Sequence, residues 1–254
     1  MTAQRWPATL WLVRHGESAG NVARDAADAA GLHRIALDGR DVDVPLSPRG
    51  EAQADALGRW FAGGHEDGRP EVILASPYVR AMETARRFRD AGGAVETVPV
   101  CPDERLREKE FGILDGLTVA GIRAQLPEQF AFRRQLGKFY HRPPGGESWA
   151  DVIFRLRSMM DTVSLHHGGQ RVMIVAHQVV VLCLRYILET MTEAQILAID
   201  KAADVANCSI TEYRFDATKG QHGGLRLARY NETAPMEDAG APVTDQPDRK
   251  ANAA

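Results

Sequence analysis

The chain has 254 residues, of which 44% are hydrophobic and 26% charged, and its formal net charge at pH 7 is −3. These values are typical of a globular protein with enough apolar side chains for a sizeable core. The balanced charge gives no electrostatic reason to expect nucleic acid or an anionic membrane as a partner. Any affinity for phosphate must therefore come from a local cluster of basic groups.

The cysteines and the apolar segments indicate the cellular compartment. Cys101, Cys183 and Cys208 are widely spaced, so we expect buried, reduced thiols, and neither a disulfide framework nor a zinc site. The N-terminus shows no targeting pattern, and no apolar run approaches the length of a membrane span. We therefore expect a cytoplasmic protein, and the sequence leaves a homodimer open as its assembly.

Short apolar segments alternate along the chain with longer segments of helical period. The expected strands are 9–13, 71–75, a weaker one at 95–100, 171–176, and a late antiparallel pair at 210–215 and 225–230 at an edge. The expected helices are 48–61, a second that follows Ser76-Pro77 and extends to about residue 89, and 147–166. This alternation predicts an α/β fold, with a mainly parallel central sheet between two layers of helices.

Two stretches are less regular. Residues 23–44 form an insert of small and charged residues, which we expect to fold as a short helix over the site. Residues 231–254 are polar and contain proline, so we expect a disordered tail. Residues 1–230 are then a single domain.

Unusual polar residues stand where the predicted strands end. Arg14 and His15 follow the first strand, Arg80 lies in the first turn of the helix after the second strand, and His177 and Gln178 follow the most apolar strand. Ligands of parallel sheets bind at this edge, where helix N-termini favour anions. The guanidinium forks of arginine suit phosphate oxygens. The sequence therefore predicts a dense anion site.

Four motifs in order extend this prediction. They are residues 12–18 with Asn21 and 45–50, then 76–85, then 106–112 with 115–116, and finally 176–177. In sequence and spacing they resemble the histidine phosphatase superfamily, in its phosphoglycerate-mutase-like branch, over roughly residues 9 to 215. The resemblance implies the three-layer fold of that branch.

The resemblance also implies a mechanism. His15 is the expected nucleophile, which attacks a phosphoryl group to give a phosphohistidine. Arg14, Arg80 and His177 would neutralise the phosphate oxygens, and Asn21 would add a neutral donor. Since three cationic groups can neutralise this charge, we expect neither a metal nor a cofactor.

The leaving oxygen needs a proton, and water must then be activated to cleave the phosphohistidine. One carboxyl group can do both if burial raises its pKa. From the residues alone, Glu104, Glu108 and Glu110 are all candidates. The resemblance selects Glu108.

Residues 127–148 are similar to the bisphosphatase half of the fructose-2,6-bisphosphate enzymes, in which basic and tyrosine residues hold the second phosphate. The similarity implies substrate contacts for Arg133, Lys138 and Tyr140, although each can also lie on a solvated helix face. Gln178 is a further candidate for substrate contact, with helix capping as the alternative.

Two departures bear on the substrate. Leu182 replaces the arginine that the bisphosphatases carry five residues after the second histidine, which argues against fructose-2,6-bisphosphate. Residues 108–112 lack the Glu-Arg-His-Tyr-Gly form usual in phosphoglycerate mutases. The expected function is therefore a metal-independent phosphatase acting on a small phosphorylated metabolite. The alternatives are mutase-type phosphoryl transfer and a non-catalytic module that binds phosphorylated ligands.

Overall fold

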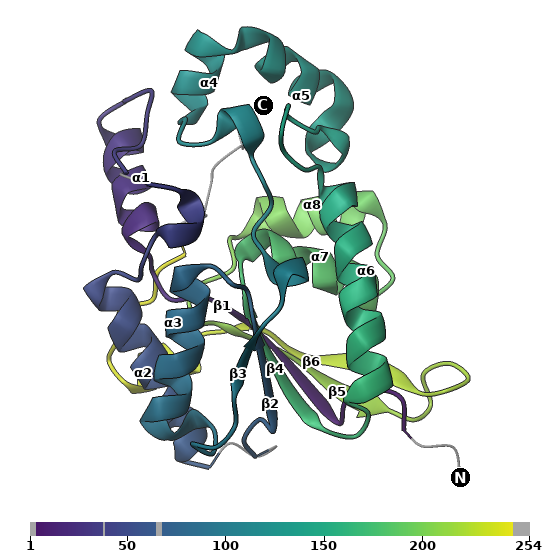
Figure 1. Cartoon of the computed structure of the whole chain (residues 1–254). Helices are drawn as coiled ribbons and strands as arrows, with labels where there is room; N and C mark the ends of the chain where they lie inside the picture. The colour runs from purple at the N-terminus through teal and green to yellow at the C-terminus, as the bar shows by residue number, and fades with distance from the viewer. Residues whose placement is uncertain (1–3, 38, 65–67, 246–254) are drawn as a thin grey trace.

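The computed structural model describes residues 4–37, 39–64 and 68–245. Its central sheet has the strand order β3-β2-β4-β1-β5-β6 (Figure 1). The first four strands in this order are parallel, and β5 and β6 complete one edge as an antiparallel pair. The bounds are β1 (Thr9–Arg14), β2 (Val72–Ala75), β3 (Val100–Pro102), β4 (Arg171–Ala176), β5 (Ile210–Asp216) and β6 (Gly224–Glu232). The predicted α/β class with a mainly parallel sheet is confirmed.

Helices cover both faces of the sheet because strand side chains alternate between the faces. Trp11 and Val13 of β1 pack with α2 and α3, whereas Leu10 and Leu12 pack with α6 and α7. Figure 1 shows the two helix layers on opposite sides of the strands. Their bounds are α2 (Pro48–Ala62), α3 (Val79–Phe88), α6 (Trp149–His166) and α7 (Gln178–Leu188).

The remaining α-helices are α1 (Ala19–Ala29), α4 (Val119–Gln125), α5 (Pro127–Tyr140), α8 (Glu193–Ala202) and α9 (Ala234–Asp238). Figure 1 shows α1, α4 and α5 beyond the edge where the parallel strands end. Short helical turns are η1 (Asp41–Asp43), η2 (Arg89–Gly93), η3 (Glu104–Leu106) and η4 (Gly112–Leu114). Among the described residues, no helix is both long enough and apolar enough to cross a membrane.

The third strand was wrongly predicted at 95–100. The Val98 amide donates to the Val95 carbonyl in a turn, and the strand β3 begins only at Val100. This turn, followed by Pro99 with no N–H to donate to a ladder, replaces the expected strand before Val100. Cys101 lies on this short edge strand and is exposed, contrary to the expected burial, while Cys183 and Cys208 are buried and all three are free thiols.

The expected disordered tail also differs from the structure. β6 continues through Glu232, and α9 packs on α2 with the Met236 side chain fully buried. Further on, Thr244 is 5% exposed. A few buried groups thus order a polar segment as far as residue 245, and residues 246–254 lie outside the described part of the chain.

The start of α6 yields a stability prediction. The Ser148 hydroxyl accepts a hydrogen bond from the Asp151 amide at 3.2 Å, and the Asp151 carboxylate accepts one from the Ser148 amide at 2.8 Å. We expect Ser148→Ala to lower the free energy of unfolding by about 1 kcal/mol, measured by denaturant titration, because the helix loses its N-cap. Ser148→Thr keeps a capping hydroxyl and should restore most of the loss. Equal stability of the alanine variant and the parent would contradict the capping role.

Candidate active site

Strand pairing brings the two predicted catalytic histidines together. The register of β1 and β4 sets Arg14 beside Ala176, so the residues that follow leave the sheet side by side. The His15 amide donates to the Ala176 carbonyl at 2.9 Å, and the imidazole centroids of His15 and His177 are 5.1 Å apart. Both side chains are fully buried.

The hydrogen bonds of His15 define its tautomer. Nδ1 lies 2.7 Å from the Gly16 carbonyl oxygen. Since a carbonyl can only accept, Nδ1 carries the proton and Nε2 keeps its lone pair. The Arg80 Nε donates to this Nε2 at 3.3 Å. The nitrogen of His15 that is the expected nucleophile therefore faces a guanidinium group, which is suited to phosphate oxygens.

Two buried arginines give the site its positive charge. Arg14 is fully buried, and one terminal nitrogen donates to the Val205 carbonyl at 2.5 Å. Arg80 is 3% exposed, and its guanidinium lies 4.9 Å from the centre of the Tyr78 ring. Because charge is costly to bury, these cations favour an anionic ligand beside them.

Ser76 has a role that the sequence analysis did not predict. The helix expected directly after Ser76-Pro77 starts later, because Tyr78 has extended backbone angles and α3 begins at Val79. The Ser76 hydroxyl instead lies 2.8 Å from Nε2 of His177 in a hydrogen bond. Its place directly after β2, at the same edge as His15, is the signal that could have identified it.

Tyr78 is the second neighbour of His177 that the sequence analysis missed. The two ring centroids are 5.0 Å apart, and the phenol donates to a Glu110 carboxylate oxygen at 3.3 Å. Burial, and then the negative charge of Glu110, raise the pKa of the Tyr78 phenol. It therefore remains a neutral donor.

The three candidate carboxyl groups differ in their burial and in their partners. Glu108 is 1% exposed, whereas Glu104 is exposed and Glu110 is bound by Tyr78. One Glu108 carboxylate oxygen accepts from the Lys109 amide at 2.7 Å. The negative charge of Glu108 also contributes to raising the pKa of the Tyr78 phenol. Glu108 is thus the buried carboxyl group among the three candidates.

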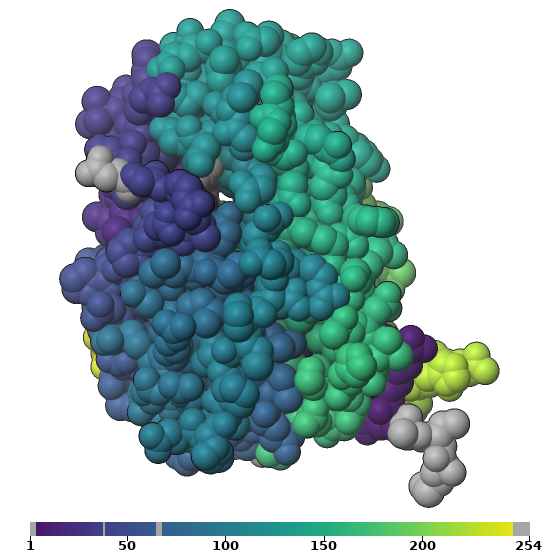
Figure 2. All heavy atoms as spheres, viewed as in Figure 1, coloured from purple at the N-terminus to yellow at the C-terminus, as the bar shows by residue number. Residues whose placement is uncertain are grey.

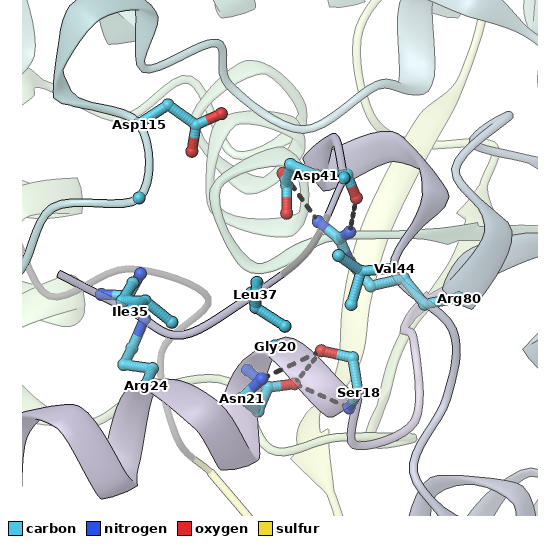
Figure 3. A pocket seen from close by; sticks show the side chains of 12 residues that line it. Ser18, Gly20, Asn21, Arg24, Ile35, Leu37, Asp41, Val44, Arg80 and Asp115 are labelled. Atoms are coloured by element: carbon cyan, nitrogen blue, oxygen red, sulfur yellow. Dashed lines mark hydrogen bonds and ion pairs between the residues drawn. The ribbon is translucent and has the colours of Figure 1, made fainter.

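Asn21 and the insert build the wall beside Arg80. The Asn21 side chain accepts from the Ser18 amide at 2.9 Å in the capping box of α1, and it lines a cavity of about 190 Å³. Figure 3 shows Arg80 and Asp41 on one side of this cavity, and Arg24 and Asp115 on the other. Arg80 therefore both contacts His15 and lines this cavity.

Asp41 of the insert contacts Arg80, for which phosphate binding is predicted. The terminal nitrogens of Arg80 donate to the Asp41 carbonyl at 2.7 Å and to its carboxylate at 3.2 Å. The space-filling view shows a small hollow between the purple insert and the teal segment beside it (Figure 2). Asp41 of the insert and Asp115 both line the cavity. The insert contains the second part of α1 and the turn η1, where a short helix was expected.

The three residues that were predicted to hold a second phosphate make no hydrogen bond with either histidine that the structure describes. We call Arg133, Lys138 and Tyr140 the distal residues. Lys138 is ion-paired with Asp200, and Tyr140 is 56% exposed with its ring against Phe139. Arg133 is partly buried, and burial lowers its pKa. Substrate contact by these three residues stays a prediction.

Gln178 follows His177 and begins α7. Its side-chain amide donates to the Asp204 carboxylate at 2.6 Å. Burial raises the pKa of Asp204, and this hydrogen bond opposes the shift. The role of Gln178 towards a substrate also stays a prediction.

A buried imidazole stands next to the distal residues. His141 is 3% exposed, and its Nε2 has no hydrogen-bond partner. Burial lowers the pKa of His141 to about 4, and the positive charges of Arg133 and Lys109 act in the same direction. His141 is therefore neutral at pH 7.

This neutral imidazole predicts a pH-dependent stability. In the unfolded chain the imidazole has a pKa of 6.5 and binds a proton below that pH, whereas in the folded protein it stays neutral until the pH falls to about 4. The contribution of His141 to the free energy of unfolding is thus fully present above pH 6.5 and is lost as the pH falls from 6.5 to about 4. We expect His141→Gln to lose less stability than the parent between these pH values, measured by denaturant titration. The exposed His166→Gln should behave like the parent, and equal slopes for all three proteins would contradict the assignment.

The comparisons with known proteins agree with this geometry. Residues 10–233 match the family model of the histidine phosphatase superfamily, branch 1. The chain belongs to this superfamily.

Within the described residues, no group of three or more histidine, cysteine, aspartate or glutamate side chains is arranged to hold a metal ion.

Relatives with different names share this sequence pattern. A 2,3-bisphosphoglycerate-dependent phosphoglycerate mutase of Methylobacterium radiotolerans is 33% identical over 190 residues, which cover 74% of this chain and 82% of the mutase. Human 6-phosphofructo-2-kinase/fructose-2,6-bisphosphatase 3 is 29% identical over 189 residues, which cover 74% of this chain but only 31% of that protein. The similarity thus extends to both mutases and phosphatases.

Solved structures share the fold. Bacillus stearothermophilus YhfR superposes with a TM-score of 0.68 at 27% identity and covers 90% of this chain and 98% of its own. A mycobacterial glucosyl-3-phosphoglycerate phosphatase gives a TM-score of 0.65 at 25% identity, with coverage of 89% and 100%. These likenesses confirm the phosphoglycerate-mutase-like fold.

Proposed function

We propose that this protein is a phosphatase that hydrolyses phosphomonoesters of small metabolites through a phosphohistidine on His15. One observation carries the proposal. Nδ1 of His15 is held by the Gly16 carbonyl, while Nε2 faces the Arg80 guanidinium at 3.3 Å. This arrangement supplies a neutral nucleophile and an anion-binding group at the same point, as phosphoryl transfer requires.

The reaction divides into two displacements. In the first, His15 Nε2 bonds to phosphorus as the bond from phosphorus to the ester oxygen breaks, and Glu108 protonates the leaving alcohol. In the second, water attacks the phosphohistidine and gives its proton to Glu108, which releases inorganic phosphate and the free imidazole. Arg14, Arg80 and His177 stabilise the charge on the phosphoryl oxygens in both steps.

The dimensions of the site favour a small substrate. A cavity of about 190 Å³ lies next to Arg80 and is smaller than typical drug-sized ligand sites, which begin at roughly 300 Å³. On the distal side, the charge of Lys138 is already balanced by Asp200, and Leu182 offers no charge. These features support a monoester over a sugar bisphosphate.

Mutase-type transfer is the second candidate, because one of the relatives described above carries the name of a phosphoglycerate mutase. A mutase must keep the phosphorylated enzyme from water and return the phosphoryl group to the substrate. The solved structures that share the fold include a phosphatase, at 25% identity, and the loop around Glu108 lacks the usual mutase sequence. The two reactions differ in their products, so a direct assay decides between them.

The first test replaces the nucleophile. We expect His15→Ala to lower kcat/KM for phosphate release from a panel of phosphomonoesters by roughly 10³-fold or more, since the covalent route is lost. Acid-labile label from a radioactive phosphomonoester should appear on the parent and not on the variant. His222→Ala, at an exposed turn, serves as the matched control. Exchange between phosphoglycerate isomers without net phosphate release would favour the mutase, and full turnover by His15→Ala would overturn the mechanism.

The second test addresses the proton donor. We expect Glu108→Gln to slow both formation and hydrolysis of the phosphohistidine by roughly 10²- to 10⁴-fold in single-turnover experiments, because neither step then has its acid or base. Glu104→Gln, at an exposed position, should leave both rates unchanged. If Glu108→Gln stays within threefold of the parent, another group provides the proton.

A further inference from the structure

The loop that carries the nucleophile, residues 15–17, is held by hydrogen bonds from several distant elements. The Gly16 amide donates to the Thr84 hydroxyl of α3 at 3.0 Å. The Glu17 amide donates to the Gln53 side-chain oxygen of α2 at 2.9 Å. The His15 carbonyl accepts from the Asn207 side-chain amide at 2.9 Å. The orientation of this nucleophile loop is therefore set from outside the loop.

One of these bonds controls the tautomer of His15. The Gly16 carbonyl and the Glu17 amide belong to the same planar peptide unit, in which they point in opposite directions. The carbonyl accepts from His15 Nδ1, while the amide donates to Gln53. Rotation of this peptide would remove the acceptor that keeps the proton on Nδ1. Gln53 thus fixes the group that makes Nε2 the nucleophile.

The orientation of Gln53 is fixed in turn by the C-terminal strap, defined as residues 241–245. The Gln53 side-chain nitrogen donates to the Pro242 carbonyl at 2.9 Å and to the Thr244 hydroxyl at 2.8 Å. Since a carbonyl only accepts, the nitrogen of the Gln53 amide must face the strap, and its oxygen must face Glu17. The Gln53 side chain is fully buried, so water cannot replace these partners.

Thr244 links both supports of the nucleophile loop. Its hydroxyl accepts from Gln53 and donates to the Asn207 side-chain oxygen at 3.0 Å. Its carbonyl accepts from the Asn207 backbone amide at 2.7 Å. Because the oxygen of the Asn207 side chain is held by Thr244, its nitrogen is directed at the His15 carbonyl. A single hydroxyl therefore orients two buried amides that both bind the loop.

We propose that Thr244 is a positioning residue for the nucleophile, and that the C-terminal strap keeps His15 in its reactive tautomer through Gln53 and Asn207. The inference rests on the proposed phosphohistidine mechanism. Thr244 is 5% exposed and touches neither His15 nor a phosphate site directly, and α9 anchors the segment before it through Met236. The strap therefore acts through the geometry of the loop.

The test compares Thr244→Val, which has a similar shape but no hydroxyl, with Thr244→Ser, which keeps the hydroxyl. Partners that orient histidines at metal sites contribute roughly 10- to 100-fold. We therefore expect Thr244→Val to slow phosphorylation of His15 about tenfold in single-turnover experiments, with little change in KM. Thr244→Ser should stay within about threefold of the parent, and the exposed Thr97→Val serves as the matched control.

Nitrogen NMR of the His15 ring provides a readout that a purely structural role would not change. The parent should carry its proton on Nδ1, and Thr244→Val should show a mixture of tautomers while its melting temperature stays near that of the serine variant. Unchanged phosphorylation rate and tautomer in Thr244→Val would overturn the proposal. Loss of the fold in Thr244→Val but not in Thr244→Ser would also overturn it, because the hydroxyl would then serve stability alone. Absence of any phosphohistidine in the parent would instead overturn the proposed function.

Discussion

The parallel pairing of β1 with β4 is the interaction on which the site depends. Their register sets Arg14 beside Ala176, and the ladder continues for one more bond, from the His15 amide to the Ala176 carbonyl. The two histidines leave the sheet together for this reason. A shift of the register by one residue would turn the side chains of β1 to the opposite layers and separate the two imidazoles. The core that fixes the register therefore also fixes the chemistry.

Buried positive charge is the second constraint. Arg14 and Arg80 are almost completely excluded from water. Remote segments contact both: the Val205 carbonyl accepts from Arg14, and the carbonyl and carboxylate of Asp41 accept from Arg80. These contacts hold the guanidinium groups in place, so less conformational entropy would be lost if they bind the phosphate of the proposed substrate. Through Asp41, the insert therefore contacts Arg80 directly.

The irregular segments of the chain turn out to be structural parts of the site. The insert supplies Asp41, and the C-terminal strap supplies Thr244, which closes a network of buried amides behind the nucleophile loop. Both segments are polar, and both become ordered because their polar groups meet buried partners that would otherwise lack hydrogen bonds. The composition of such a segment describes its average solvation and does not reveal these particular bonds.

The sequence by itself determined the parallel core and the positions of Arg14, His15, Arg80 and His177. Those features are local: an apolar strand, its last residue and the turn that follows are read within one short window. Only the tertiary structure decided which groups support them. Ser76 reaches His177 across 101 residues and Thr244 reaches Gln53 across 191, and no local pattern encodes contacts of that separation. Their hydroxyl groups acquire a role only because folding buries them beside polar partners that water can no longer satisfy.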